Sequence, residues 1–428
     1  MQIRSLNNQV IKYLSGVLTL LMFMAQYTSS HAQAESRAHS RSTAVEDLYR
    51  HCPEARYPDQ KAGHTFSLSQ GKQQVSNTAS LIKDQPAKLV RRIGVWGDSH
   101  TASGDFIYAA LNQWGIPKRD IRPSLIQPAF QMPGVRLPLR KLCLSSGWAT
   151  VHAQRGFQQG GLFNQTLLQI RSETSNDFMW IDFRFPHENV RLDQLRVHFV
   201  KEDPDRVLVM GVTVDNQQEK YFSTTPDLPS TLEINASHPF ATIRIRLIVG
   251  ELIVQALEPV YSNPPATLVD IFSSPGAVAK VWSDFKPVIL GKPYETVIFE
   301  YGTNEAMASD FNEAEYTNAL RKSLSNFRAL HPKAHCILIG PPERGGVSNR
   351  PPTPYTVIHK IINQVQIKVA KEQGCKAWNW QASLQTMGTL KQLSVYTLPI
   401  LGADMVHLTK ESYEISGQMF GKMISWKN

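Results

Sequence analysis

Hydrophobic and polar positions follow two different patterns along the 428-residue chain. From residue 89 to residue 114, and again from residue 267 onward, short apolar runs alternate with longer stretches in which apolar residues recur at helical spacing. That alternation predicts strands joined by helices, as in a parallel sheet with helices on both faces. Between residues 150 and 261 the apolar runs are short and are separated by turn residues, which predicts an antiparallel β-sandwich.

The two patterns together predict a discontinuous domain. An α/β domain formed by residues 89–149 and 262–428 is interrupted by the β-sandwich at residues 150–261, so that neither half can close its core alone. Residues 35–88 are polar and irregular, and we expect them to pack on the outside of the α/β domain.

The expected elements follow from the period of each apolar run. In the α/β parts we expect a strand and a helix within 89–114, strands at 295–300, 336–340 and 375–380, and helices at 313–330, 355–372 and 411–426. In the sandwich we expect strands at 178–185, 195–200, 207–214, 241–247 and 251–260.

The N-terminus has the features of a secretory signal peptide. Arg4 and Lys12 precede an apolar stretch at residues 14–25, and small residues follow at positions 30–34. We expect residues 1–34 to be removed on export, with an uncleaved membrane anchor as the alternative. No later apolar run is long enough to cross a membrane, so we expect no transmembrane segment in the mature protein.

Composition narrows the class of protein. Hydrophobic residues make up 42% of the chain and charged residues 19%, which is typical of a folded globular protein rather than a disordered one. The formal net charge of +9 suits an anionic polymer. However, Lys and Arg are scattered and form no basic stripe with interleaved aromatic residues, so we expect no nucleic-acid partner.

Four cysteines, Cys52, Cys143, Cys336 and Cys375, are available for disulfide bonds in an oxidising compartment. Cys336 and Cys375 open two apolar runs that we expect to be successive parallel strands. Because the starts of parallel strands lie at the same edge of a sheet, these two are the preferred pair. The pairing of Cys52 and Cys143 stays open. The cysteine spacings do not resemble those of zinc ligands, so no metal site is expected.

A candidate nucleophile lies at the end of the first expected strand. Residues 89–104 read LVRRIGVWGDSHTASG, so that Ser99 follows a buried strand and precedes a helix. At the carboxyl end of a central strand a hydroxyl stands clear of the sheet, and the N–H groups of the following turn can bind an oxyanion. Taken alone, the triplet Gly97-Asp98-Ser99 is more typical of an ordinary turn or helix cap.

Two distant segments carry the groups that a serine nucleophile requires. Asn304 follows the apolar run at residues 296–299, and Asp404 and His407 lie just before the C-terminal helix. His407 is the candidate base, and Asp404, three residues earlier in a tight turn, can hold its imidazole in the productive tautomer. The alternative is that Asp404 caps the helix and His407 is a surface residue.

The order of these motifs, GDS, then YGTNE, then DMVH, resembles the motif blocks of the SGNH, or GDSL-type, hydrolases. The resemblance implies a three-layer α/β/α, flavodoxin-like fold and a serine esterase that needs no cofactor. It also implies an oxyanion hole built from the backbone N–H groups of Ser99 and Gly276 and the carboxamide of Asn304. For the glycine donor, Gly291 and Gly134 are alternatives, and Gly276 could equally be an ordinary glycine at the start of a helix.

Residues beside these motifs receive supporting roles. We expect His100 to contact the substrate or to lie behind the catalytic residues, because successive side chains at a strand-to-helix turn point apart. We expect Asp98 to buttress the turn, and Glu305 to cap the next helix rather than act as a general acid. Trp378 and Trp380 alternate on an expected strand, and we expect both in the core rather than on a sugar-binding surface.

A narrower resemblance rests on four segments together: GDSH, YGTNEA, the cysteine-led strand with WNW, and ADMVHLT. They resemble the peptidoglycan O-acetylesterases of Gram-negative bacteria, in which a β-sandwich similar to a carbohydrate-binding module is inserted after the nucleophile motif. The resemblance implies a periplasmic enzyme that removes acetyl groups from the muramic acid O-6 position of peptidoglycan. Alternatives are an esterase for another acetylated polysaccharide, a polysaccharide O-acetyltransferase with the same catalytic residues, and a non-catalytic glycan-binding protein of the envelope.

Overall fold

The computed structural model describes residues 65–72 and 90–424, apart from 157–161, 202, 204, 225–229, 286, 348–352, 390–391 and 393–398. The expected signal peptide at residues 1–34 lies outside the described residues, as does most of the segment 35–88. Within the part of the chain that is described, no helix is both long enough and apolar enough to cross a membrane.

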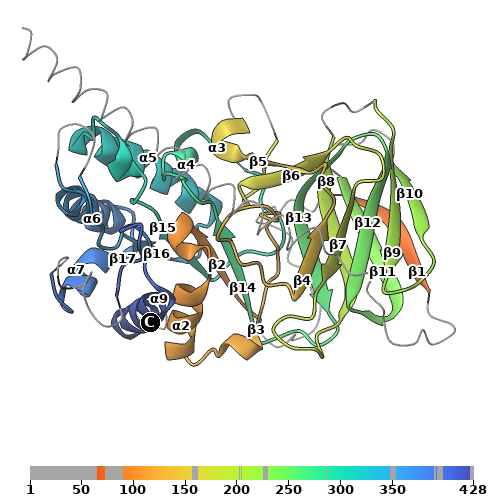
Figure 1. Cartoon of the computed structure of the whole chain (residues 1–428), viewed down its shortest axis with the longest axis horizontal. Coiled ribbons are helices and arrows are strands. Elements are labelled where there is room, and N and C mark those ends of the chain that lie inside the picture. Colours follow the sequence, from red (N-terminus) through yellow and green to blue (C-terminus); the bar gives the residue numbers. More distant parts are fainter. Residues whose placement is uncertain are drawn as a thin grey trace, which may run out of the picture. The chain divides into compact units, whose positions relative to one another are not determined.

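A six-stranded parallel sheet forms the centre of the α/β domain (Figure 1). Its order is β17 (Lys376–Trp378), β16 (His335–Ile339), β15 (Thr296–Glu300), β2 (Arg91–Gly97), β14 (Thr267–Ser273) and β3 (Ile121–Arg122). Strand β2 lies in the middle, where Val95 pairs with Ile271 on one side and with Ile298 on the other. The expected three-layer α/β fold is thereby confirmed.

Helices cover both faces of this sheet. Neighbouring residues of each strand point to opposite faces, so both faces carry apolar side chains that pack against helices. On one face, Val95 packs in a core shared with α2 (Asp105–Gln113), α7 (Trp380–Gln385) and α9 (Lys410–Met423). On the other, Trp96 packs in a core shared with α4 (Val281–Asp284), α5 (Glu313–Leu330) and α6 (Tyr355–Glu372). Helices α2 and α9 touch closely, since a Cβ atom at Gly417 would lie 2.2 Å from the carbonyl oxygen of Phe106.

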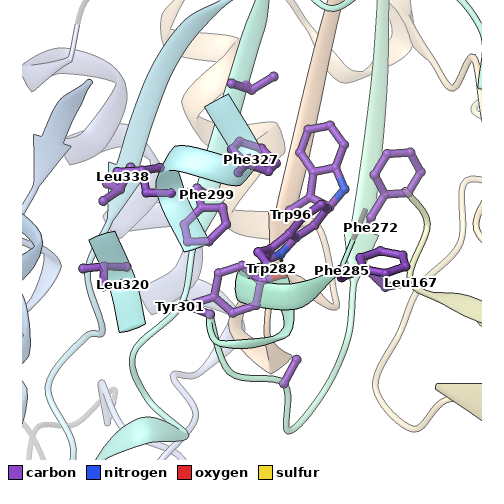
Figure 2. Close-up of a cluster of buried hydrophobic side chains, with 14 of the residues drawn as sticks. Trp96, Leu167, Phe272, Trp282, Phe285, Phe299, Tyr301, Leu320, Phe327 and Leu338 are labelled. Carbon is purple, nitrogen blue, oxygen red and sulfur yellow. Dashed lines mark hydrogen bonds between the residues drawn. The ribbon is translucent and has the colours of Figure 1, made fainter. Parts of the chain in front are cut away.

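Trp96 is the centre of an aromatic cluster (Figure 2). The rings of Phe272, Trp282 and Phe327 surround its indole, with their centroids 5.1 to 6.2 Å from that of Trp96. The buried indole N–H donates to the carbonyl of Gln165 at 2.8 Å, so the largest side chain of β2 is satisfied as well as packed. This cluster fixes the strand that ends just before Ser99.

Two antiparallel sheets form the inserted β-sandwich. The first has the order β1 (Phe66–Lys72), β11 (Ser230–Phe240), β8 (Leu192–Val200), β13 (Leu252–Tyr261), β6 (Leu168–Ser172) and β5 (Ala149–His152). The second has the order β10 (Lys220–Thr224), β9 (Leu208–Val214), β12 (Thr242–Val249), β7 (Phe178–Asp182) and β4 (Lys141–Leu144). In β12, Ile243, Ile245 and Leu247 are buried while Arg244 is exposed, as the alternating pattern predicts.

The sandwich extends beyond the expected boundary at residue 150, whereas its last strand, β13, ends at Tyr261 as expected. Strand β5 already pairs with β6 from Ala149, and β4 lies earlier still. Strand β1 comes from the segment expected to be irregular and pairs with β11 along its whole length, from Phe66 to Lys72. Its sequence, FSLSQGK, is short and polar, and its partner lies more than 150 residues away, so local pattern carries little signal for it.

The structure differs in detail from two expectations about residues 375–380. The strand expected at 375–380 ends at Trp378, because the side chain of Asn379 caps a helix that begins at Trp380 by accepting a hydrogen bond from the N–H of Ala382. Both tryptophans are buried in the core, as expected, although they do not alternate on one strand.

Cys336 and Cys375 form a disulfide in the structure, with Cα atoms 4.7 Å apart. Cys336 belongs to β16, and Cys375 immediately precedes β17, so the bond joins the starts of two neighbouring parallel strands. Cys143 is also disulfide-bonded.

Candidate active site

The sequence motifs meet at the carboxyl edge of the parallel sheet. Ser99 follows β2, Gly276 follows β14 and Asn304 follows β15, and these three strands are neighbours in the sheet. The chain passes from β2 to β3 and β14 on one side and then crosses to β15 on the other. Loops at such a switch point diverge and leave room for a ligand, which is where open α/β sheets bind their substrates.

Ser99, His407 and Asp404 form a continuous hydrogen-bonded relay. The Oγ of Ser99 lies 2.8 Å from Nε2 of His407, and Nδ1 of His407 lies 2.7 Å from Oδ2 of Asp404. Ser99 is half-buried, whereas the side chains of Asp404 and His407 are 52% and 42% exposed. The relay is therefore assembled and accessible from solvent, and Asp404 orients the imidazole instead of merely capping the next helix.

A tight turn before α9 holds both ends of the relay. The second carboxylate oxygen of Asp404, Oδ1, accepts the backbone N–H groups of Val406 and His407 at 3.0 Å each. Burial alone would raise the pKa of Asp404, but the hydrogen bonds from the His407 side chain and from these two N–H groups outweigh it and lower the pKa to about 2. Asp404 is consequently ionised throughout the neutral range, as a group that stabilises an imidazolium must be.

Two of the three expected oxyanion donors are available. Among the described residues, the backbone N–H groups of Ser99 and Gly276 have no hydrogen-bond partner. Gly276 is exposed, has a φ of +81°, and lies in a turn closed by a hydrogen bond from the N–H of Ala277 to the carbonyl of Ser274. A positive φ at this position favours glycine.

The third expected donor, Asn304, is already engaged. Its Nδ2 donates to Oδ2 of Asp98 at 3.2 Å and to the carbonyl of Ala277 at 2.9 Å. An Asn side chain has only two N–H groups, so Asn304 can bind an oxyanion only by sharing one of them. Gly291 and Gly134 were the alternatives to Gly276 as the glycine donor. Gly291 lies beside the side chain of Arg92, near the end of β2 opposite Ser99. Gly134, like Gly276, has a positive φ, of 78°.

Neither a protein-family model nor a curated protein matches this sequence. Among solved structures, that of a peptidoglycan O-acetylesterase matches with a TM-score of 0.57 and 18% sequence identity, covering 79% of this chain and 91% of that chain. At this identity the match shows the fold alone. The chain therefore has the fold of that solved structure, with an α/β domain built on a parallel sheet.

Two other solved structures match less well. A lipase/acylhydrolase from Enterococcus faecalis is 18% identical, covering 38% of this chain and 80% of that chain with a TM-score of 0.29. A family two carbohydrate esterase from Cellvibrio japonicus is 9% identical, covering 66% of this chain and 96% of that chain with a TM-score of 0.26.

His100 lies behind the relay and not in it. Its ring is fully buried, and Nδ1 is hydrogen-bonded to the hydroxyl of Tyr413 on α9 at 2.9 Å. Burial lowers the pKa of His100 well below its usual value, and the nearby His407 lowers it further, so the ring is neutral at physiological pH. Of the two roles expected for His100, burial leaves only the one behind the catalytic residues.

Glu305 does not cap the helix that follows it, because the short 3-10 helix Glu305–Met307 begins at Glu305 itself. Instead, its Oε1 accepts the backbone N–H of Ala279 at 2.7 Å, which joins the loop after β15 to the loop after β14.

Sequence reasoning missed two charged residues that hold the site loops. Arg344, in the loop after β16, donates to the carbonyl of Thr303 at 3.3 Å, and its guanidinium lies 4.0 Å from the ring centre of Tyr355. The next residue, Gly345, donates its N–H to the carbonyl of Met405 in the relay turn at 2.8 Å. The second missed residue, Glu300, is the last residue of β15 and its only charged one. That acidic residue at the end of a buried strand is the one sequence feature that could have indicated its role.

Among the described residues, no group of three or more His, Cys, Asp or Glu side chains is arranged to hold a metal ion.

Proposed function

We propose that this protein is a serine esterase that removes O-acetyl groups from a cell-envelope polysaccharide, with peptidoglycan acetylated at the muramic acid O-6 position as the first candidate. The observation that carries the proposal is the relay from Asp404 through His407 to Ser99, with contacts of 2.7 and 2.8 Å. The fold shared with a peptidoglycan O-acetylesterase supports the choice of substrate class.

In the first half of the reaction Ser99 becomes acetylated. His407 takes the proton of the Ser99 hydroxyl as its oxygen attacks the acetyl carbonyl, and ionised Asp404 stabilises the resulting imidazolium. The carbonyl oxygen gains a negative charge, which the N–H groups of Ser99 and Gly276 can bind. Each preorganised donor of this kind is worth about 3–4 kcal/mol in the transition state. His407 then protonates the sugar oxygen as the carbon–oxygen bond breaks.

In the second half, water releases the acetyl group. His407 takes a proton from a water molecule, whose oxygen attacks the acetyl-serine carbonyl at the same oxyanion site. The proton then returns to Oγ of Ser99 and acetate leaves. We further propose that the inserted sandwich helps to present the glycan to the relay, whose Asp404 and His407 side chains are exposed to solvent.

The decisive experiment measures acetate released from O-acetylated peptidoglycan, with base-treated peptidoglycan as the blank. We expect the mature protein to release acetate only from the acetylated polymer, and Ser99→Ala to release none. Ser103→Ala is the matched control, because this serine lies in the same loop but its Oγ accepts the N–H of Asp105 and is outside the relay. It should keep near-normal activity.

The outcomes separate the alternatives. Acetyl transfer to an added oligosaccharide without free acetate identifies a transferase, and acetate released only from another acetylated polysaccharide reassigns the substrate. If Ser99→Ala keeps wild-type turnover on a simple acetyl ester, the catalytic assignment is wrong.

A further inference from the structure

Two carboxyl side chains lie buried together beneath the nucleophile turn. Glu300, the last residue of β15, and Asp98, which precedes Ser99, are both inaccessible to solvent. Oε2 of Glu300 accepts the backbone N–H of Asp98 at 3.1 Å. The space for this contact exists because residue 97 is glycine, where a Cβ atom would lie 2.7 Å from the same oxygen.

Asp98 in turn holds the groups that border the site. Its Oδ1 accepts the backbone N–H of His100 at 2.9 Å, and its Oδ2 accepts an N–H of Asn304 at 3.2 Å. Glu300 therefore contacts the residue that orients Asn304 without touching Asn304, Ser99 or His407 itself.

The hydrogen bonds that Glu300 and Asp98 accept are enough to stabilise one negative charge on the pair, not two. Asp98 receives two N–H groups on its side-chain oxygens, whereas Glu300 receives one, and Oε1 of Glu300 is buried without a partner among the described residues. Two adjacent carboxylates without solvent cannot both ionise at moderate cost. The member that receives more hydrogen bonds keeps the charge, and that member is Asp98.

The ionisation behaviour agrees with this geometry. Burial raises the pKa of Glu300 well above its usual value, and the charge of Asp98 raises it further. Burial raises the pKa of Asp98 only to about 6, because the N–H of His100 and the side chain of Glu300 both stabilise the carboxylate of Asp98. At neutral pH the proton therefore stays on Glu300.

The surrounding titratable groups favour the same distribution. Arg344 and His407 favour the charged form of Asp98, whereas Glu305 disfavours a charge on Glu300. Tyr301, Tyr413 on α9 and His100 also lie near the pair, and burial keeps all three neutral.

We propose that Glu300 is a positioning residue that works as a neutral carboxylic acid and keeps the single negative charge of the pair on Asp98, which orients the Asn304 carboxamide beside the nucleophile. This rests on the proposed esterase function, in which Asn304 shares an N–H with the oxyanion. The uncharged state of Glu300 is thus the functional one.

The test compares an uncharged replacement with a truncation. Glu300→Gln keeps the shape and the neutrality of the side chain, so we expect it to keep kcat/KM on a simple acetyl ester within about threefold of the wild type. Glu300→Ala removes the contact with Asp98 and should lower kcat roughly tenfold or more with little change in KM, because the oxyanion contact acts in the transition state. Glu295→Gln, just before the other end of β15, is the control and should change neither value.

An infrared measurement tests the protonation state without depending on activity. At about pH 8 the difference spectrum between the wild type and Glu300→Gln should contain the C=O stretching band of a protonated carboxylic acid, even though a free glutamate is ionised there. The same band should be absent from the difference spectrum for Glu295→Gln.

The possible results separate the two proposals. If no protonated-acid band is found, or if Glu300→Gln loses as much kcat as Glu300→Ala, the assignment of Glu300 is overturned. If the band is present but the wild type cleaves no acetyl ester, the esterase function fails while the neutral state of Glu300 stands. Similar losses in folding yield for Glu300→Ala and Glu300→Gln would also count against the positioning role, because they would show that the position serves only packing.

Discussion

Replacing Glu305 by glutamine should stabilise the folded protein at alkaline pH and change its stability little at acid pH. The carboxyl group of Glu305 is buried between two site loops, where Oε1 accepts the N–H of Ala279 and Oε2 has no partner among the described residues. Burial raises its pKa from 4.5 to about 7. Hydrogen bonds from backbone N–H groups oppose the increase, and the charge of Asp98 adds to it.

The direction in which the stability changes with pH follows from proton linkage. A carboxyl group with a higher pKa in the folded state binds its proton more tightly there than in the unfolded chain. Its contribution to stability is complete below about pH 4.5 and is lost as the pH rises through about 7. At about 1.4 kcal/mol per pKa unit, the loss amounts to about 3 kcal/mol at alkaline pH. Glutamine does not ionise and can accept the same N–H group, so the variant avoids this loss.

The assay is guanidinium unfolding of both proteins at about pH 5 and about pH 9, followed by tryptophan fluorescence, since Trp96 and Trp282 lie in the core of the α/β domain. We expect the difference in unfolding free energy between variant and wild type to grow by about 2–3 kcal/mol from the lower to the higher pH. Glu313→Gln, an exposed position in the first turn of α5, should show no such growth. A difference that is the same at both pH values would refute the reasoning, because Glu305 would then be ionised in the folded protein at pH 5.

Two further predictions concern the framework of the site. The Cys336–Cys375 disulfide closes a loop of 39 residues, so replacing both cysteines by alanine should lower the unfolding free energy by up to about 4 kcal/mol; an unchanged denaturation midpoint would contradict this. Gly417→Ala would place a methyl group 2.2 Å from the carbonyl oxygen of Phe106. It should therefore push α9 away from α2 and cost about 1–3 kcal/mol or more, whereas Gln418→Ala, exposed on the same helix, should cost little; equal midpoints for the two variants would show that the helices are not in close contact.

Sequence pattern was most informative where an element is long or its periodicity is strong. The helices at 313–330 and 355–372 have the predicted bounds, because each carries an apolar face through several turns. The parallel strands were recognisable as buried apolar runs between such helices. Since parallel strands present their carboxyl ends at one edge, motifs that follow strands could be expected to meet even when 308 residues separate Ser99 from His407.

The features that sequence pattern could not give depend on which strands are neighbours. The contact between Glu300 and Asp98 exists because β15 lies beside β2 with Glu300 opposite Gly97. Nothing in either strand alone fixes that register. Strand β1 is similar, since its pairing with β11 is decided by the free edge of a sheet whose other strands come from much later in the chain. The engagement of Asn304 by Asp98 and Ala277 required side-chain positions as well.

Asp98 and Asp404 show why residue type alone does not assign a role. Asp404 is half-exposed, accepts three hydrogen bonds, and has a pKa of about 2, so it is charged at neutral pH. Asp98 is fully buried, accepts two N–H groups on its side chain, and has a pKa of about 6. Solvent access and the supply of donors therefore separate two chemically identical groups by about four pKa units. In the proposed mechanism, the aspartate that stabilises the imidazolium is the one that is ionised at neutral pH by a wide margin, while the aspartate that orients Asn304 depends on Glu300 to remain charged there.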